Sequence, residues 1–106
     1  MNETITLNLS PLSVNKAWQG KRFATAEYKR WTEWGLLLLK KVKRCDEPQK
    51  LEITFYLAKQ ADIDNPIKPF LDLLKKAGVI EDDRKIEMLV VKKVVSKERK
   101  IEFRFL

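Results

Sequence analysis

Strand and helix patterns meet in one stretch of this chain, residues 51–78, which reads LEITFYLAKQADIDNPIKPFLDLLKKAG. Apolar and polar side chains alternate over residues 51–57, which is the period of a strand with one buried face. Residues 59–66 predict an extended connection, and apolar side chains then recur at helical spacing to about Ala77. Gly78 stands where helices commonly end, because glycine adopts left-handed backbone angles without strain. The stretch therefore predicts a strand, a connection and a helix.

The flanking residues continue this succession of elements. Residues 5–9 alternate as a strand does, residues 10–24 show no sustained period and predict a long loop, and Thr25 is a plausible cap for a helix to about Lys43. Residues 86–95 and 101–105 predict two more strands, joined in a hairpin by a polar turn. The order β-α-β-α-β-β within one domain, residues 1–106, predicts an α+β fold. We expect a two-layer sandwich with the helices on one face of a mixed sheet.

The helix predicted after Thr25 is apolar on more than one side. Tyr28, Trp31 and Gly35 belong to one face at helical spacing, while Trp34 and Leu37 begin a second one. A helix of this kind needs more than one surface to cover it. One interpretation is a stripe that faces the core and another that faces a partner. A core-only explanation of the same residues is equally open.

The charge balance indicates a polyanionic partner. The 106 residues include 22 Lys and Arg against 15 Asp and Glu, a net charge of +7. Nine basic residues lie between Lys16 and Arg44 with only two acidic ones, whereas acidic residues gather at Asp62, Asp64 and residues 81–83. Such an excess and such a separation favour nucleic acid as the partner, although many basic proteins bind no polyanion.

The residue types also exclude several classes of chemistry. The chain has no histidine and one cysteine, which excludes histidine-based catalytic triads, an intrachain disulfide and a zinc cluster. A metal would have to bind oxygen ligands, as Mg²⁺, Mn²⁺ and Ca²⁺ do. The longest apolar run is far shorter than a membrane span, and the N-terminus has no signal-like region. We therefore expect a cytoplasmic protein that does not enter a membrane.

Two groups of acids and one lysine are candidates for a metal-dependent phosphoryl site. In an extended backbone, Asp62 and Asp64 would point to the same side, and paired carboxylates of this kind suit a hard cation. Lys68 lies one helical turn beyond and could offer a positive charge to a phosphate. Asn65 could cap the helix that begins near Pro66. Taken singly, an Asp-x-Asp pair is as readily a helix-entry cap, and residues 81–83 are as readily a polar turn.

In combination these residues resemble the RusA-like Holliday junction resolvases. The chain carries Asp62-Ile-Asp-Asn-x-x-Lys68, then Asp72, an Ala-Gly turn and the Asp82-Asp83 pair, in the order and close spacing of that family. The segment Pro11-Leu-Ser-Val-Asn15-Lys16 also resembles the family's Pro-Pro-Ser-x-Asn segment. Pro66 and Pro69 depart from the family's pattern, and so does the single Lys59 in place of a basic cluster.

The resemblance implies a homodimer that resolves four-way DNA junctions by paired nicks, using Mg²⁺ or Mn²⁺. By matching positions, Asp62, Asp64 and Asp83 are expected to hold the metal and, with Lys68, to be catalytic. We expect Asn15, Lys16, Lys21 and Arg22 to contact DNA phosphates. The resemblance also implies a bacterial or prophage source.

Three other functions remain open from the sequence. The first is a non-catalytic basic DNA-binding protein, such as a phage accessory protein, that has kept the fold. The second is a general flap or branched-DNA nuclease with the same metal chemistry. The third is an RNA-binding module, although the aromatic residues do not form the exposed strand motif that RNA-binding sheets use.

Overall fold

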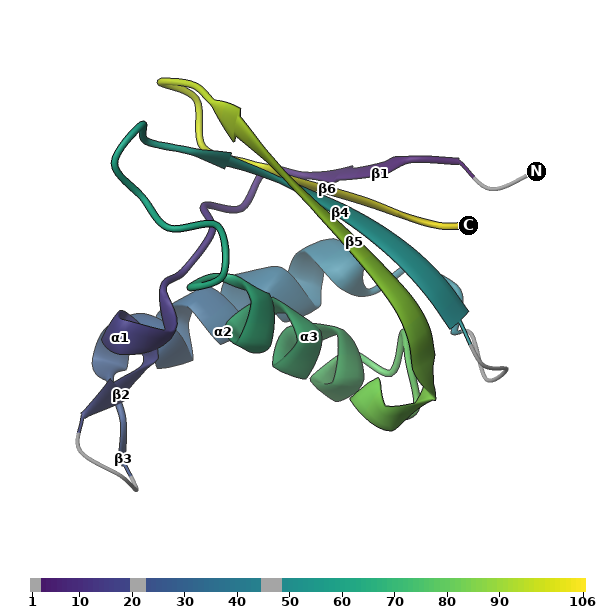
Figure 1. Cartoon of the computed structure of the whole chain (residues 1–106). Coiled ribbons are helices and arrows are strands. Elements are labelled where there is room, and N and C mark those ends of the chain that lie inside the picture. Colours follow the sequence, from purple (N-terminus) through teal and green to yellow (C-terminus); the bar gives the residue numbers. More distant parts are fainter. Residues whose placement is uncertain (1–2, 20–22, 45–48) are drawn as a thin grey trace.

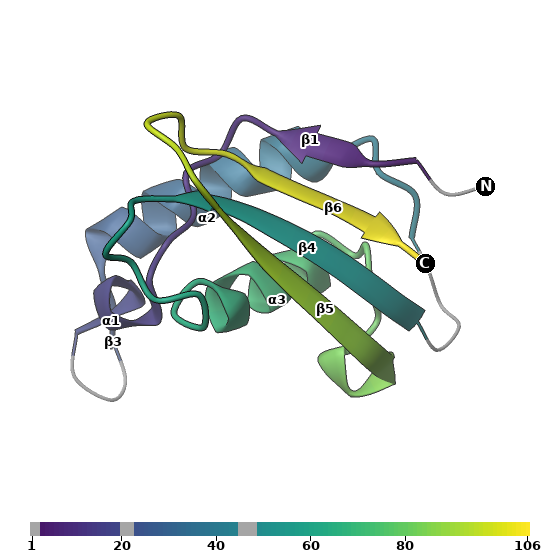
Figure 2. The same ribbon diagram turned by 45° about the horizontal axis from the view of Figure 1, so that its top comes forward.

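The protein forms two layers, a four-stranded mixed sheet and a pair of helices on one of its faces (Figures 1 and 2). The computed structural model describes residues 3–19, 23–44 and 49–106, and for residues 16–19 and 23–24 it describes the backbone alone. The predicted α+β sandwich and the order of its main elements are confirmed.

The sheet is built around the strand predicted at 51–57. This strand, β4 (Gln49–Leu57), pairs in parallel with β5 (Ile86–Val95) and antiparallel with β6 (Ile101–Phe105). The short strand β1 (Ile5–Leu7) pairs antiparallel with β6 and completes the order β1-β6-β4-β5. Both sides of β4 are therefore paired, as expected of the strand that is most apolar on its inner face.

The predicted hairpin between the last two strands is wrong, because β4 lies between β5 and β6. The physical reason is burial. Ile101 and Phe103 of β6 are buried and contribute to the core, whereas Val94 and Val95 at the end of β5 remain exposed. β6 therefore takes the inner position beside β4, and β5 occupies the edge.

The two long helices begin and end close to where their sequence signals predict. Helix α2 (Ala26–Leu39) is capped by Thr25, whose hydroxyl oxygen accepts a hydrogen bond from the Tyr28 amide at 3.1 Å. It ends four residues before the predicted Lys43, so the basic residues that follow lie beyond it. Helix α3 (Ile67–Lys76) is followed by Gly78 at a φ of 75°, as the sequence predicts.

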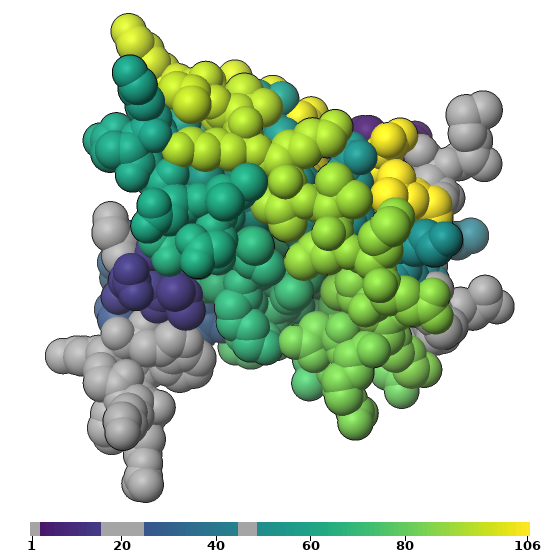
Figure 3. All heavy atoms as spheres, viewed as in Figure 1, coloured from purple at the N-terminus to yellow at the C-terminus, as the bar shows by residue number. Residues whose placement is uncertain are grey.

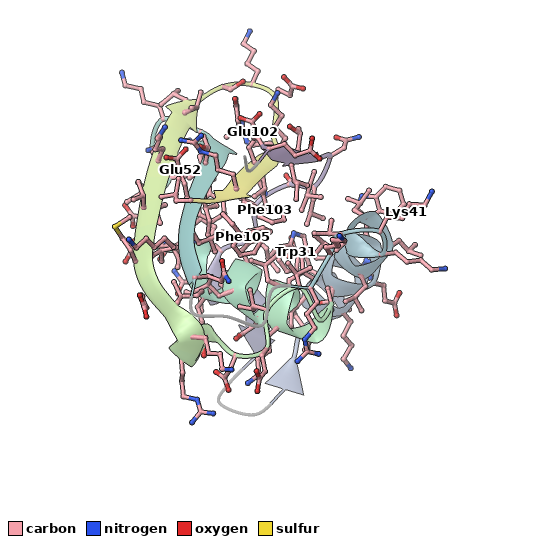
Figure 4. All side chains as sticks on the ribbon, turned by 90° about the vertical axis from the view of Figure 1, so that its right-hand side faces the viewer. Trp31, Lys41, Glu52, Glu102, Phe103 and Phe105 are labelled. Atoms are coloured by element: carbon pink, nitrogen blue, oxygen red, sulfur yellow. The ribbon has the colours of Figure 1, made fainter. Side chains whose placement is uncertain are left out.

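The core lies between the sheet and these helices. Phe70 of α3 packs edge-to-face against Phe55 and Phe103 of the sheet, with ring centroids 5.9 and 5.5 Å apart. Viewed along the layers, Phe103 and Trp31 point into the space between sheet and helices, while Lys41 points away from it (Figure 4). The predicted buried stripe of α2 is confirmed for Tyr28, Trp31 and Gly35.

Gly35 allows α2 and α3 to approach each other closely. A Cβ atom at this position would lie 2.5 Å from Cδ2 of Leu73, a fully buried side chain of α3. Trp34 and Leu37, which form the second apolar face of α2, are 50% and 63% exposed. The core-only explanation of this helix therefore fails for these two residues.

The segment predicted as a loop at 10–24 contains regular structure. It forms the short helix α1 (Val14–Ala17) and the strand pair β2 (Trp18–Gln19) and β3 (Phe23–Ala24). Sequence periodicity could not predict these short elements, because each spans too few residues to show a repeating pattern. None of the helices in the described residues has the length and apolar character needed to cross a membrane.

Candidate functional site

The connection between β4 and α3 carries Asp62 and Asp64 as a series of turns. The prediction of an extended segment is wrong here, because the Ala61 amide donates to the Ala58 carbonyl at 3.1 Å and the Ile67 amide donates to the Asp64 carbonyl at 3.2 Å. The alternation argument for the two carboxylates therefore does not apply. Both side chains are exposed and make no hydrogen bond or ion pair with any other described residue.

This connection is held from the sheet by Lys93 of β5. The ammonium group of Lys93 donates hydrogen bonds to the carbonyl of Lys59 at 2.8 Å and to that of Ala61 at 2.5 Å. The second bond ends one residue before Asp62, so the sheet fixes the backbone from which this carboxylate projects. Sequence reasoning missed Lys93, since a lysine within a strand gives no sign of the backbone that it reaches.

Asn65 does not cap α3 as predicted. The cap position belongs to Pro66, which makes no side-chain hydrogen bond to the helix. Instead, the Asn65 carbonyl accepts a hydrogen bond from the Val14 amide at 2.8 Å. The bond joins α1 to the Asp-x-Asp connection, and the space-filling view shows these two segments side by side (Figure 3). Two motifs some fifty residues apart in the chain thus form one surface.

Lys68 connects the Asp-x-Asp end of α3 to the second acidic group. Its Nζ atom lies 2.9 Å from Oδ1 of Asp72 and 3.0 Å from Oδ2 of Asp83. Hydrogen bonds to these two carboxylates, Asp72 first, raise the pKa of Lys68 to about 12. At neutral pH the side chain is therefore a cation and not a proton acceptor. Asp83 therefore shares this ammonium group with Asp72 of α3.

Asp82 and Asp83 have different surroundings although they are adjacent. Asp82 precedes the 3-10 helix η1 (Asp83–Lys85), and its carboxylate accepts a hydrogen bond from the Arg84 amide at 3.2 Å. This hydrogen bond is the main reason why the pKa of Asp82 lies well below its usual range. Asp82 also lies 3.5 Å from the ammonium group of Lys75. Its interactions stabilise the turn, whereas Asp83 is directed at Lys68.

The predicted acidic residues have the chemistry to bind a hard cation, but they do not form a preformed metal site. Carboxylate oxygens are the ligands that Mg²⁺ and Mn²⁺ prefer, and Asp62 and Asp64 have theirs exposed. Among residues 3–19, 23–44 and 49–106, no three acidic or cysteine side chains stand close enough together to hold an ion. Mg²⁺ commonly binds only one or two carboxylates, with waters and substrate phosphates completing its shell. The donor set fits that mode of binding.

The residues predicted to contact DNA lie only in part within the described residues. Asn15 is exposed in α1, beside the Asp-x-Asp connection. Lys16 belongs to the same helix, but its side chain is outside the described part, and Lys21 and Arg22 lie outside it altogether. Their contacts with DNA stay predictions.

Comparison with known families agrees with the motif. The profile of the family described as Endodeoxyribonuclease RusA matches residues 13–104, nearly the whole chain. None of the curated protein sequences matches this one closely enough to count as a relative. The matched range includes the segment from Asp62 to Lys68, the Asp82-Asp83 pair and residues 13–16 of the N-terminal segment. The chain therefore belongs to the RusA family of endodeoxyribonucleases.

Proposed function

We propose that this protein is a divalent-metal-dependent endonuclease that resolves four-way DNA junctions by paired nicks. Asp62, Asp64 and Asp83 would hold the metal, and Lys68 would be the catalytic cation. One observation carries the proposal: the Lys68 ammonium, four residues after Asp64, lies 3.0 Å from the carboxylate of Asp83. This contact links the second acidic stretch to the lysine of the Asp-x-Asp-Asn-x-x-Lys segment.

The roles of these residues follow from the chemistry of phosphodiester hydrolysis. The reaction needs an activated water and stabilisation of the negative charge that develops on the phosphoryl group and the leaving oxygen. A bound Mg²⁺ or Mn²⁺ supplies Lewis acidity and lowers the pKa of water. Because the chain has no histidine, a carboxylate is the available proton acceptor.

Lys68 is suited to electrostatic stabilisation. Its raised pKa keeps it charged at every physiological pH, and its side chain is 59% exposed, so it is open to a phosphate. Substrate phosphate oxygens would replace a carboxylate as its partner when DNA binds. The lysine then offers its charge to the reacting group.

A second copy of the chain would provide the second cut. A four-way junction has approximate two-fold symmetry, and a C₂ dimer presents two identical sites at a fixed separation. The exposed apolar face of α2, Trp34 and Leu37, is our candidate for part of this interface. Large exposed apolar side chains on a small basic domain favour association.

A cleavage assay tests the proposal. The wild-type protein, Asp62→Asn and the matched control Glu33→Gln, an exposed residue of α2, are incubated with Mg²⁺ or Mn²⁺ and with a four-way junction, duplex, flap or single strand. We expect paired nicks in the junction from wild type and control, and junction binding without cleavage from Asp62→Asn. Equal cleavage of flaps would support the branched-DNA nuclease. Binding without any cleavage by the folded wild-type dimer would support the non-catalytic alternative and overturn the proposal.

A further inference from the structure

A pocket of about 500 Å³ opens directly beside Asp62. Four separate segments contribute to it: residues 10–13, the first turns of α2, the connection after β4, and Arg99 in the turn before β6. Ligand pockets in proteins typically measure about 300–1,000 Å³. The pocket therefore has the size of a binding site and lies next to the proposed reaction centre.

The inner wall of the pocket is apolar and fixed in place. Leu12, Trp31 and Leu57 line it, and each is less than a tenth exposed. The indole N–H of Trp31 donates to the Ser10 carbonyl at 2.6 Å, which locks the orientation of the ring. Such a wall offers dispersion contact to a flat, weakly polar group.

The rim of the pocket carries polar side chains that are not engaged elsewhere. Glu27, Gln60 and Asn65 are among the residues that line the pocket, and their side chains make no hydrogen bond with the rest of the described chain. Amides and carboxylates are the groups that recognise base edges: Asn and Gln pair with adenine, and Glu accepts from the cytosine amino group. The rim has the hydrogen-bonding capacity that a nucleobase requires.

The charges around the pocket favour a base over a phosphate. Glu27 and Asp62 place two carboxylates at the pocket, whereas Arg99 is the one cation among its described lining residues and is engaged by the Ser96 carbonyl. A phosphate in the pocket would meet the repulsion of both acids. A neutral nucleobase would not meet this repulsion.

We propose that the pocket receives an unstacked nucleobase next to the scissile phosphate, and that Glu27 and Gln60 make the cut sequence-selective. This inference rests on the proposed nuclease function. Extruding a base from a duplex requires unpairing and unstacking, which is least costly where pairing is already interrupted. The centre of a branched junction is such a place.

Cleavage-site mapping tests the selectivity. Junctions whose branch point migrates through all dinucleotides are cut by wild type, Glu27→Gln, Gln60→Ala and the control Glu33→Gln. Glu27, Gln60 and Glu33 are exposed, so none of these substitutions disturbs the core. We expect wild type and control to share one preferred dinucleotide, and each pocket variant to lose about tenfold in discrimination, the typical value of one base contact. Unchanged preference in both pocket variants, or no preference in wild type, would overturn the inference while leaving the nuclease intact.

A binding measurement separates this inference from the proposed activity. The Asp62→Asn protein is bound to junctions that carry 2-aminopurine beside the cut position, and fluorescence reports unstacking. We expect the 2-aminopurine fluorescence to increase on binding, and to increase less when the protein also carries Gln60→Ala. This expectation holds even if wild type cleaves no substrate. No increase at either neighbouring nucleotide would overturn the inference independently of cleavage.

Discussion

Replacing Lys93 by methionine tests whether the sheet positions the Asp62 backbone. Methionine keeps an unbranched apolar stem but removes the two hydrogen bonds, of 2.8 and 2.5 Å, to the carbonyls of Lys59 and Ala61. A hydrogen bond to a charged group contributes roughly 1.5–3 kcal/mol. Because Lys93 is half-buried and water partly replaces the lost bonds, we expect the free energy of unfolding to fall by about 1–2 kcal/mol.

The effect on cleavage should exceed the effect on stability. A displacement of about 1 Å in a positioned group can reduce a rate by on the order of a hundredfold. We therefore expect Lys93→Met to reduce the single-turnover cleavage rate ten- to a hundredfold at saturating enzyme, with junction affinity nearly unchanged. Gel-shift titration, single-turnover kinetics and urea unfolding measure the three quantities.

Lys92→Met is the matched control, since consecutive strand residues face opposite sides of the sheet. Lys92 is 56% exposed and forms a surface ion pair with Glu52 at 3.3 Å, which should contribute little to stability. Its cleavage rate should match wild type. Wild-type cleavage by the folded Lys93→Met variant, or an equal loss in both variants, would refute the positioning argument.

Two further predictions concern the helix pair and its lysine. Gly35→Ala should lower the free energy of unfolding, measured in urea, by about 1 kcal/mol. Overpacking against the buried Leu73 costs about 1–3 kcal/mol, which outweighs the gain in helix propensity of about 1 kcal/mol. In a Leu73→Ala background the same change should not lower the free energy of unfolding. Lys68→Met should change stability by less than about 1 kcal/mol, since its ion pairs are exposed, yet abolish cleavage. The folded-state pKa of Lys68 is raised above 10.5, so its contribution to stability is complete below about pH 10.5 and disappears as pH rises through about 12. The cleavage rates of wild type and Lys68→Arg are compared as the pH is raised. A wild-type rate that falls with an apparent pKa of 7 to 9, while the Lys68→Arg rate does not, would contradict a permanently charged Lys68.

Local patterns along the chain predict most of the helices and strands and much of the motif. Period-two alternation located β4 and β6, and the valine-rich run at residues 86–95 indicated β5. Helical spacing, with a cap at Thr25 and a glycine at Gly78, located both long helices. These features are local, since a backbone pattern is set by residues a few positions apart. The spacing of Asp62, Asp64 and Lys68 was available for the same reason.

Which elements are neighbours depends on how the whole chain packs. The alternation of β6 records that one of its faces is buried, but not that β4 rather than β5 lies beside it. The contact of Lys68 with Asp83, and the reach of Lys93 to a carbonyl 32 residues away, likewise join parts of the chain that no local pattern relates. The reason is physical: periodicity reports the burial of a face, whereas the partner that buries it depends on how the whole core packs.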